Sequence, residues 1–234
     1  MKRILFLPLF ILSFGSCDTI MKTANALGNG TITEQEAGDG IKQALSKGVD
    51  AGISLLIKQD GFFGNQAYKL FLPADAQKIE NTLRNIGFGN QVDKAILQIN
   101  RSAENAVGFA KPIFVDAIRE MTLTDALNIV KGDKNAATNY FREITKAKLI
   151  AAFSPQIKSS LDNMNATKYY GDIVNTYNNL PTTFKKINPD LVGYVSERAI
   201  NALFDQVEKE EANIRENPLD RSTELLKKVF GMNK

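Results

Sequence analysis

Apolar residues recur along most of the chain at the three- and four-residue steps that are typical of amphipathic α-helices. The clearest row lies within residues 90–120 and contains Val92, Ile96, Ile99, Ala103, Ala106 and Ala110. It continues beyond Pro112, which predicts a kink or a short break there. Sustained strand alternation is absent from the sequence. We therefore predict an all-α fold, a multi-helix bundle of about eight helices with at most one short β-hairpin or extended segment, at residues 68–73.

Residues that begin or end helices divide this pattern into elements. Thr122 and Asp125 have the spacing of a capping box, and Gly61 and Gly87 each stand where a helix should end in a left-handed residue. The predicted helices cover residues 34–58, 75–86, 90–120, 122–131, 134–151, a shorter one from 154, 167–179, 189–213 and 219–230.

A row of small residues runs along the first predicted helix. Gly40, Ala44, Gly48 and Gly52 recur every four residues beside a row of aliphatic side chains. A membrane dimer of the Gly-x-x-x-Gly kind is excluded, because charged residues interrupt the segment. The row therefore predicts close packing of another helix of the same domain.

The first seventeen residues have the layout of a secretory signal. Lys2 and Arg3 precede eleven apolar residues, and Gly15 and Ser16 then lead to Cys17. Eleven helical residues span roughly 16 Å, about half of a bilayer core. The ending resembles a bacterial lipobox, in which the Cys is lipidated, although Phe14 stands where a branched aliphatic residue is usual. The alternative is an ordinary signal with a free Cys.

These features predict three segments. Residues 1–16 are a signal peptide, residues 17–33 are the lipidated Cys17 and a flexible tether, and residues 34–234 are a single helical domain. A coil of this length reaches roughly 20–25 Å, so the domain stays near its membrane. The predicted location is lipid-anchored in the bacterial cell envelope, on the periplasmic side or at the cell surface.

The composition excludes several kinds of chemistry. The chain has no His and no Trp, and Cys17 is its single Cys. It therefore lacks a Ser–His relay, a Cys–His nucleophile, a Cys/His zinc site and an internal disulfide. Without Lys2 and Arg3, 27 basic residues face 26 acidic ones, which gives no electrostatic reason to expect nucleic acid as a partner. We predict no cofactor and no metal.

Several motifs resemble a known but uncharacterised family. They are Asn100–Ala106, Met121-Thr122 with Asp125-Ala126, Ala136–Phe141, Tyr194-Val195, and the closing run from Glu211 through Arg215 to Gly231. Together they resemble a domain-of-unknown-function family of helical, exported bacterial proteins, often lipoproteins, from about residue 34 to the end. The resemblance implies a helical fold and export, and it implies no activity.

Arg101, Glu104, Asp125, Tyr140 and Arg215 are the candidates for a polar pocket. Arg101 and Glu104 lie on the face of their helix opposite the apolar row. They form either a solvated ion pair or, if the helix is packed on two sides, part of a pocket. Near Arg215, the acidic residues 208, 210 and 211 predict a solvated helix end.

Three functions agree with these observations. The first is a non-enzymatic binding or scaffold lipoprotein of the cell envelope, with the membrane and an envelope protein as partners. The second is a helical carrier of an apolar ligand. The third is an enzyme that uses carboxylate, Lys or Tyr chemistry, which requires ionisable groups that converge in one cleft.

Overall fold

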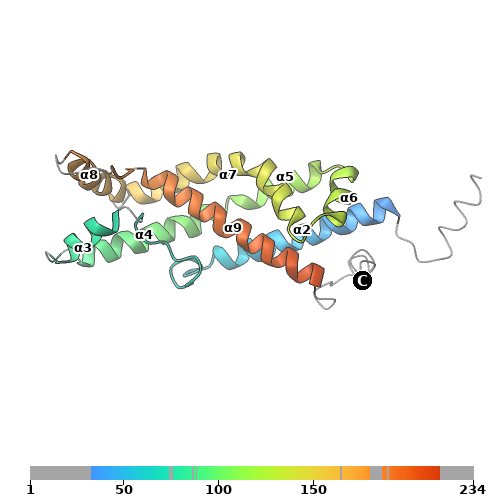
Figure 1. Ribbon diagram of the computed structural model, residues 1–234, viewed down its shortest axis with the longest axis horizontal. Helices are drawn as coiled ribbons and strands as arrows, with labels where there is room; N and C mark the ends of the chain where they lie inside the picture. Colours follow the sequence, from blue (N-terminus) through green and yellow to red (C-terminus); the bar gives the residue numbers. More distant parts are fainter. Residues whose placement is uncertain are drawn as a thin grey trace, which may run out of the picture. The chain divides into compact units, whose positions relative to one another are not determined.

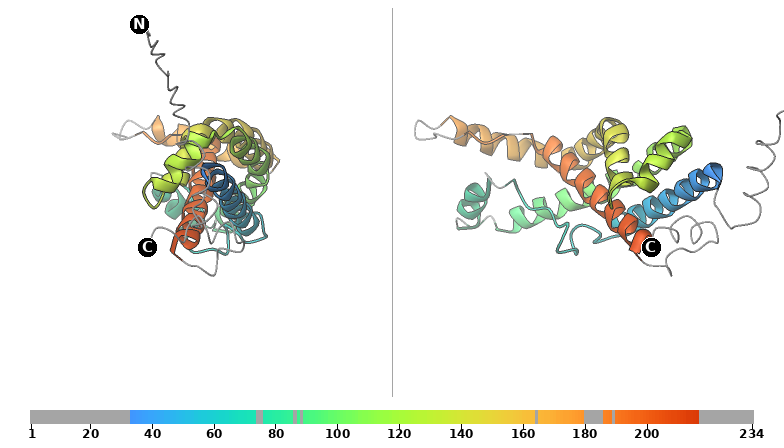
Figure 2. Two further views of the ribbon diagram at one scale, coloured as in Figure 1. Left: turned by 90° about the vertical axis from the view of Figure 1, so that its right-hand side faces the viewer. Right: turned by 45° about the vertical axis from the view of Figure 1, so that its right-hand side comes forward.

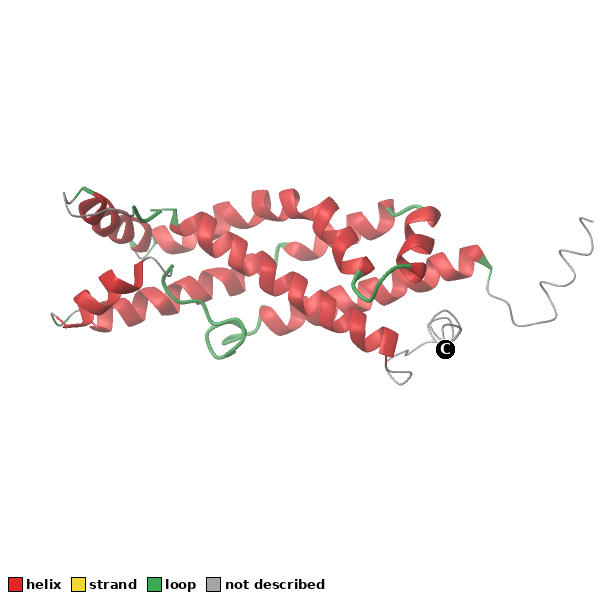
Figure 3. Cartoon of the chain, in the orientation of Figure 1, coloured by secondary structure: helices red, strands yellow, loops and turns green. Residues whose placement is uncertain are grey.

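Helices form all regular structure in the residues that the computed structural model describes, 33–73, 76–85, 87, 89–163, 165–179, 186–188 and 190–216. The all-α prediction is confirmed (Figure 3). The helices are α2 (Glu34–Leu56), α3 (Gln77–Asn85), α4 (Gly89–Val107), α5 (Ala110–Glu120), α6 (Leu123–Lys131), α7 (Ala136–Asp162), α8 (Ala166–Asn178) and α9 (Leu191–Glu216). Six of these described helices are long, with eleven or more residues, whereas α3 and α6 are short, with nine residues each. The number of long helices is therefore six rather than the eight or so we expect.

Helix α9 is the element around which the others pack. It runs obliquely across its neighbours (Figures 1 and 2) and contacts α7, α2 and α4. Phe204 of α9, Phe114 of α5 and Phe141 of α7 are fully buried, and the ring of Phe114 lies 5.3 Å from Phe141 and 6.0 Å from Phe204. These edge-on aromatic contacts join three helices in one core.

The small residues of α2 permit one of these contacts. A Cβ atom on Gly52 would lie 3.0 Å from the Cβ of Gln206, and one on Gly48 would lie 3.3 Å from the Cβ of Glu210. Both neighbours belong to α9. The predicted close packing within the domain is therefore confirmed.

Two of the predicted helix ends are confirmed and one is wrong. Thr122 and Asp125 form a capping box at the start of α6, and Gly87 has a φ of +94°. At the end of α2, however, Asp60 has the positive φ in place of Gly61. Gly61 is needed there for a different reason, because a Cβ would lie 2.5 Å from the carbonyl oxygen of Leu56.

Two predictions made from proline are corrected. The break between α4 and α5 lies at Gly108 and Phe109, and Pro112 sits in the first turn of α5, where a missing N–H costs nothing. The two helices predicted on either side of Ser154 are one helix, α7, with Pro155 inside it.

An internal proline costs a helix about 3 kcal/mol. Phe153 and Ile157, on either side of Pro155, are fully buried, and α7 packs on both α4 and α9. Each buried apolar side chain contributes about 1.5–3 kcal/mol, which outweighs the cost and explains why α7 continues.

Some expectations fall on other parts of the chain. The signal, the lipidated Cys17 and the final helix at 219–230 lie outside the described residues. Across the described ranges, no helix combines the length and the apolar character that crossing a bilayer would require.

Candidate functional site

Arg101 and Glu104 fasten a turn to α4. Glu104 is buried, and its Oε1 accepts hydrogen bonds from the backbone N–H groups of Phe62 (3.1 Å) and Phe63 (3.3 Å). Its Oε2 accepts one from Arg101 at 2.7 Å, and Arg101 also pairs with Asp60 at 2.7 Å. The carboxylate is thus occupied by the turn that follows α2.

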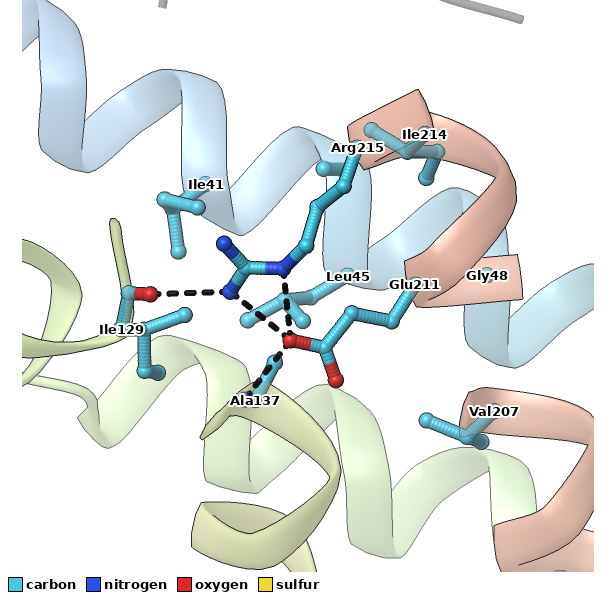
Figure 4. A pocket seen from close by; sticks show the side chains of 10 residues that line it. Ile41, Leu45, Gly48, Ile129, Ala137, Val207, Glu211, Ile214 and Arg215 are labelled. Carbon is cyan, nitrogen blue, oxygen red and sulfur yellow. Dashed lines mark hydrogen bonds and ion pairs between the residues drawn. The ribbon is translucent and has the colours of Figure 1, made fainter. Parts of the chain in front are cut away.

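Arg215 belongs to a second buried junction, around Glu211 (Figure 4). Glu211 accepts hydrogen bonds from the N–H groups of Ala137 (3.0 Å) and Thr138 (2.9 Å) and from the Thr138 hydroxyl (2.8 Å). Arg215 donates to Glu211 at 2.8 Å and to the carbonyl of Ile129 at 2.9 Å. The expected solvated helix end is wrong here, because this pair joins the end of α6 and the start of α7 to α9.

The cavity beside this junction is small. It has a volume of ≈ 20 Å³, on the order of one water molecule, between α2, α6, α7 and α9. An acyl chain needs far more space. The cavity therefore does not suit the apolar ligand of the carrier hypothesis.

Asp125 and Tyr140 lie at a third place. Asp125 serves the capping box, and the hydrogen bonds from the side chain and then the backbone of Thr122 lower its pKa. Burial raises the pKa of Tyr140, and the charges of Asp125 and Glu120 raise it further. The structure therefore assigns the five predicted residues to three helix junctions, and they do not share one pocket.

A larger hollow lies elsewhere, and sequence reasoning missed it. It is an open groove with a volume of ≈ 560 Å³, within the range of ligand sites, between residues 67–72 and one face of α9. We name it the α9 groove. The lining residues of α9 follow helical spacing and share one face. They are Tyr194, Arg198, Asn201, Ala202, Asp205 and Lys209.

The opposite wall of the α9 groove begins in a turn closed by the N–H groups of Tyr68 and Lys69 on the carbonyl of Asn65, and continues through residues 70–72 as a loop (Figure 3). Fully buried Asn100 of α4 accepts a hydrogen bond from the N–H of Leu70 and donates one to its carbonyl, both at 2.8 Å. On the other side, the Tyr194 hydroxyl donates to the carbonyl of Phe71 at 3.2 Å. Asn100 thus pairs with the segment as a neighbouring strand would, and it holds the wall in place.

Tyr68 connects the two walls. Its hydroxyl donates to Asp205 and accepts from Gln206 and, at 2.7 Å, from Lys209. Lys209 and Asp205 also pair at 2.8 Å. Burial and then the bond to Asp205 raise the pKa of Tyr68.

The pKa values of the two charged residues that contact Tyr68 are also shifted away from neutral pH. The bond to Asp205 and then the bond to Tyr68 raise the pKa of Lys209. Burial alone would raise the pKa of Asp205, but the hydrogen bonds from Lys209 and Tyr68 outweigh it and lower that pKa. At neutral pH the groove therefore holds a neutral phenol, a carboxylate and an ammonium, none of which exchanges protons readily.

Two further cations line the groove. The Nζ of Lys69 lies 4.2 Å from the ring centre of Phe63 and 5.6 Å from that of Phe71, and the guanidinium of Arg198 lies 5.7 Å from the ring of Tyr194. Among the described residues, neither cation forms a salt bridge. Because Lys209 and Asp205 neutralise each other, the α9 groove carries an excess of about two positive charges.

No cluster of three or more His, Cys, Asp or Glu side chains in the described ranges is arranged to hold a metal ion. Comparison with known proteins gave one finding. The sequence model of a family described as "Protein of unknown function (DUF4197)" matches residues 31–231, which confirms the resemblance to an uncharacterised family. No curated protein and no solved structure matches the chain.

Proposed function

We propose that this chain, which belongs to the DUF4197 family of proteins of unknown function, is an exported bacterial lipoprotein that binds an envelope partner through the α9 groove without catalysis. Two independent features support this proposal. The first is the N-terminal sequence, which concerns location. The second is the chemistry of the groove, which concerns activity.

The support for lipid anchoring is the order of residues 2–17. A basic pair, eleven apolar residues and two small residues lead to Cys17, the single Cys of the chain. Acyl chains on this Cys contribute roughly 0.8 kcal/mol for each buried CH₂, and several chains make a stable anchor. The domain then lies within reach of other proteins of the same envelope.

The observation that carries the binding function is the state of the ionisable groups in the groove. Acid–base catalysis needs a pKa near the working pH, but the pKa values of Tyr68, Asp205 and Lys209 are all shifted away from it. The wall is also fixed in advance by Asn100, which lowers the cost of ordering on binding. A preformed, positively charged groove suits recognition.

The buried carboxylates support the same conclusion. Glu104 binds two backbone N–H groups and Arg101, and Glu211 binds two backbone N–H groups, a hydroxyl and Arg215. Their carboxylate oxygens are occupied by hydrogen bonds within the fold, and neither residue lines the α9 groove.

The anchoring is tested by growing the native host with an alkyne analogue of palmitate and isolating the protein. Wild-type chain should carry the label and sediment with membranes. Cys17→Ser should lose the label and leave the membrane fraction. An unlabelled wild-type protein that fractionates as a free species would refute the location.

The binding role is tested separately with a photo-crosslinking amino acid in the native envelope. It is placed at Asn201, which is exposed in the α9 groove, or at Lys146, which is equally solvent-facing on α7 and outside the groove. A defined crosslinked product should appear only from position 201. The same products from both positions, or none from 201, would refute binding through the groove.

A further inference from the structure

We propose that the occupant of the α9 groove is an extended acidic peptide segment of another envelope protein, whose carboxylates are bound by Arg198 and Lys69. This inference rests on the proposed binding function and names the class of ligand. It is argued from the charge and length of the groove and from the side chains of the wall opposite α9.

The charge of the groove favours an anionic ligand. Lys209 is neutralised by Asp205 at 2.8 Å, whereas Arg198 and Lys69 contact aromatic rings and form no salt bridge among the described residues. Arg198 is on α9 and Lys69 is on the opposite wall. A ligand with two carboxylates can pair with both walls at once, and the planar guanidinium of Arg198 suits bidentate carboxylate binding.

The length of the groove favours a chain over a small anion. Its lining on α9 extends from Tyr194 to Lys209, which is about 22 Å along a helix. An extended peptide covers this length with about six or seven residues.

The wall opposite α9 presents both a charge and an apolar ring to such a segment. Leu70 is buried, whereas Lys69 and Phe71 lie on one side of the wall, because the Nζ of Lys69 is 5.6 Å from the ring centre of Phe71. Lys69 offers a charge, and Phe71, which is 51% exposed, offers an apolar ring. This surface fits an extended peptide that has an acidic and an apolar residue two positions apart on one face.

A lipid headgroup fits less well. Phosphate would satisfy the cations, but the apolar groups near them are aromatic rings at an open groove, Phe63 and Phe71 beside Lys69 and Tyr194 beside Arg198, rather than an enclosed slot for acyl chains. The remaining lining includes the amides of Asn201 and Gln77, which can hydrogen-bond to a peptide backbone. The observations therefore favour the peptide.

The test uses the purified full-length chain in detergent and a fluorescein-labelled heptapeptide, Glu-Glu-Leu-Leu-Glu-Glu-Leu, in which Glu and Leu alternate along each face of the extended chain. Binding is followed by fluorescence anisotropy. The peptide should bind, and its affinity should fall as salt is raised. A matched peptide with Gln in place of Glu should bind at least about tenfold more weakly, because it cannot form charge-assisted bonds.

Matched variants separate the groove from general charge. Lys69→Gln with Arg198→Gln should weaken the Glu peptide at least about tenfold. Lys146→Gln with Arg119→Gln removes the same two charges from exposed positions outside the groove and should leave affinity within about twofold. Circular dichroism spectra of both double variants should match that of the wild type, which checks that they fold. The comparison of the Glu and Gln peptides uses wild-type protein and so does not depend on any variant.

Several results would overturn the proposal. One is equal affinity for the Glu and Gln peptides, and another is an equal loss in both double variants. A third is displacement of the Glu peptide by glycerol phosphate, the headgroup unit of an anionic lipid, at concentrations where glutarate has no effect. A partner crosslinked at position 201 alongside any of these results would preserve the binding function and reject only the acidic peptide.

Discussion

Glu211→Ala should destabilise the fold by about 3–5 kcal/mol, the usual cost of removing one partner of a buried ion pair. Two effects combine in this variant. The first turn of α7 loses the acceptor for the N–H groups of Ala137 and Thr138. Arg215, whose side chain is 15% exposed, is left with its charge buried beside Ile129.

Arg215→Met should cost less, about 1–2 kcal/mol. Glu211 keeps its three hydrogen bonds from Ala137 and Thr138 in that variant. It also remains at the positive end of the α7 dipole, which stabilises a carboxylate. The structure thus predicts an order of effects as well as their size.

Urea unfolding and thermal unfolding, both followed by far-ultraviolet circular dichroism, measure the free energy of unfolding and the Tm of both variants, since the chain has no Trp for fluorescence. In a domain of this size, 1 kcal/mol corresponds to about 2–4 °C, so Glu211→Ala should lower Tm by roughly 10 °C. A Glu211→Ala variant within about 1 kcal/mol of wild type, or an Arg215→Met variant that costs more, would refute the assignment of Glu211 as the centre of this junction.

Three further predictions concern other places in the fold. Asn100→Leu leaves the backbone groups of Leu70 unpaired, so stability should fall by about 2–4 kcal/mol and hydrogen exchange in residues 68–72 should rise, as mass spectrometry would show. Gly52→Ala should destabilise by about 1–3 kcal/mol because its Cβ meets α9, whereas Gly171→Ala, which meets nothing within 4 Å, should stabilise α8 by about 0.5–1 kcal/mol in the same urea assay. The pKa of Asp125 in the folded state lies below its ordinary value of 3.8. Its carboxylate therefore stabilises the fold fully above pH 3.8, and this stabilisation is lost as the pH falls through the folded-state pKa. Asp125→Asn should therefore differ from wild type at neutral pH and converge with it in strong acid, and a difference that persists there would contradict the capping role.

Local sequence features predicted the parts of the fold that depend on residues close together in the sequence. The row through Ile99 indicated a buried face on α4, and Ile99 is fully buried. The Thr122 and Asp125 pair indicated the start of α6, because a capping box is formed within four residues. The spacing of Gly48 and Gly52 indicated a close helix contact but not that α9 is the partner.

The α9 groove could not be predicted in this way. Tyr68 and Lys209 are 141 positions apart, and only the packing of α9 against residues 67–72 brings them together. Asn100 gave a weak signal, because it is a polar residue next to a core position in a helix. Its reciprocal bonds with Leu70 depend on a segment 30 residues away.

The ionisable residues that stood out in the sequence and those that line the groove differ in one physical respect. Glu104 and Glu211 each accept hydrogen bonds from consecutive backbone N–H groups of another segment, so both carboxylates hold chain segments together. Arg198 and Lys69 have no such commitment among the described residues and face an open hollow. A charged side chain is available for a ligand only when the fold does not already satisfy it. The free cations, rather than the buried carboxylates, are therefore where a partner of this domain should be sought.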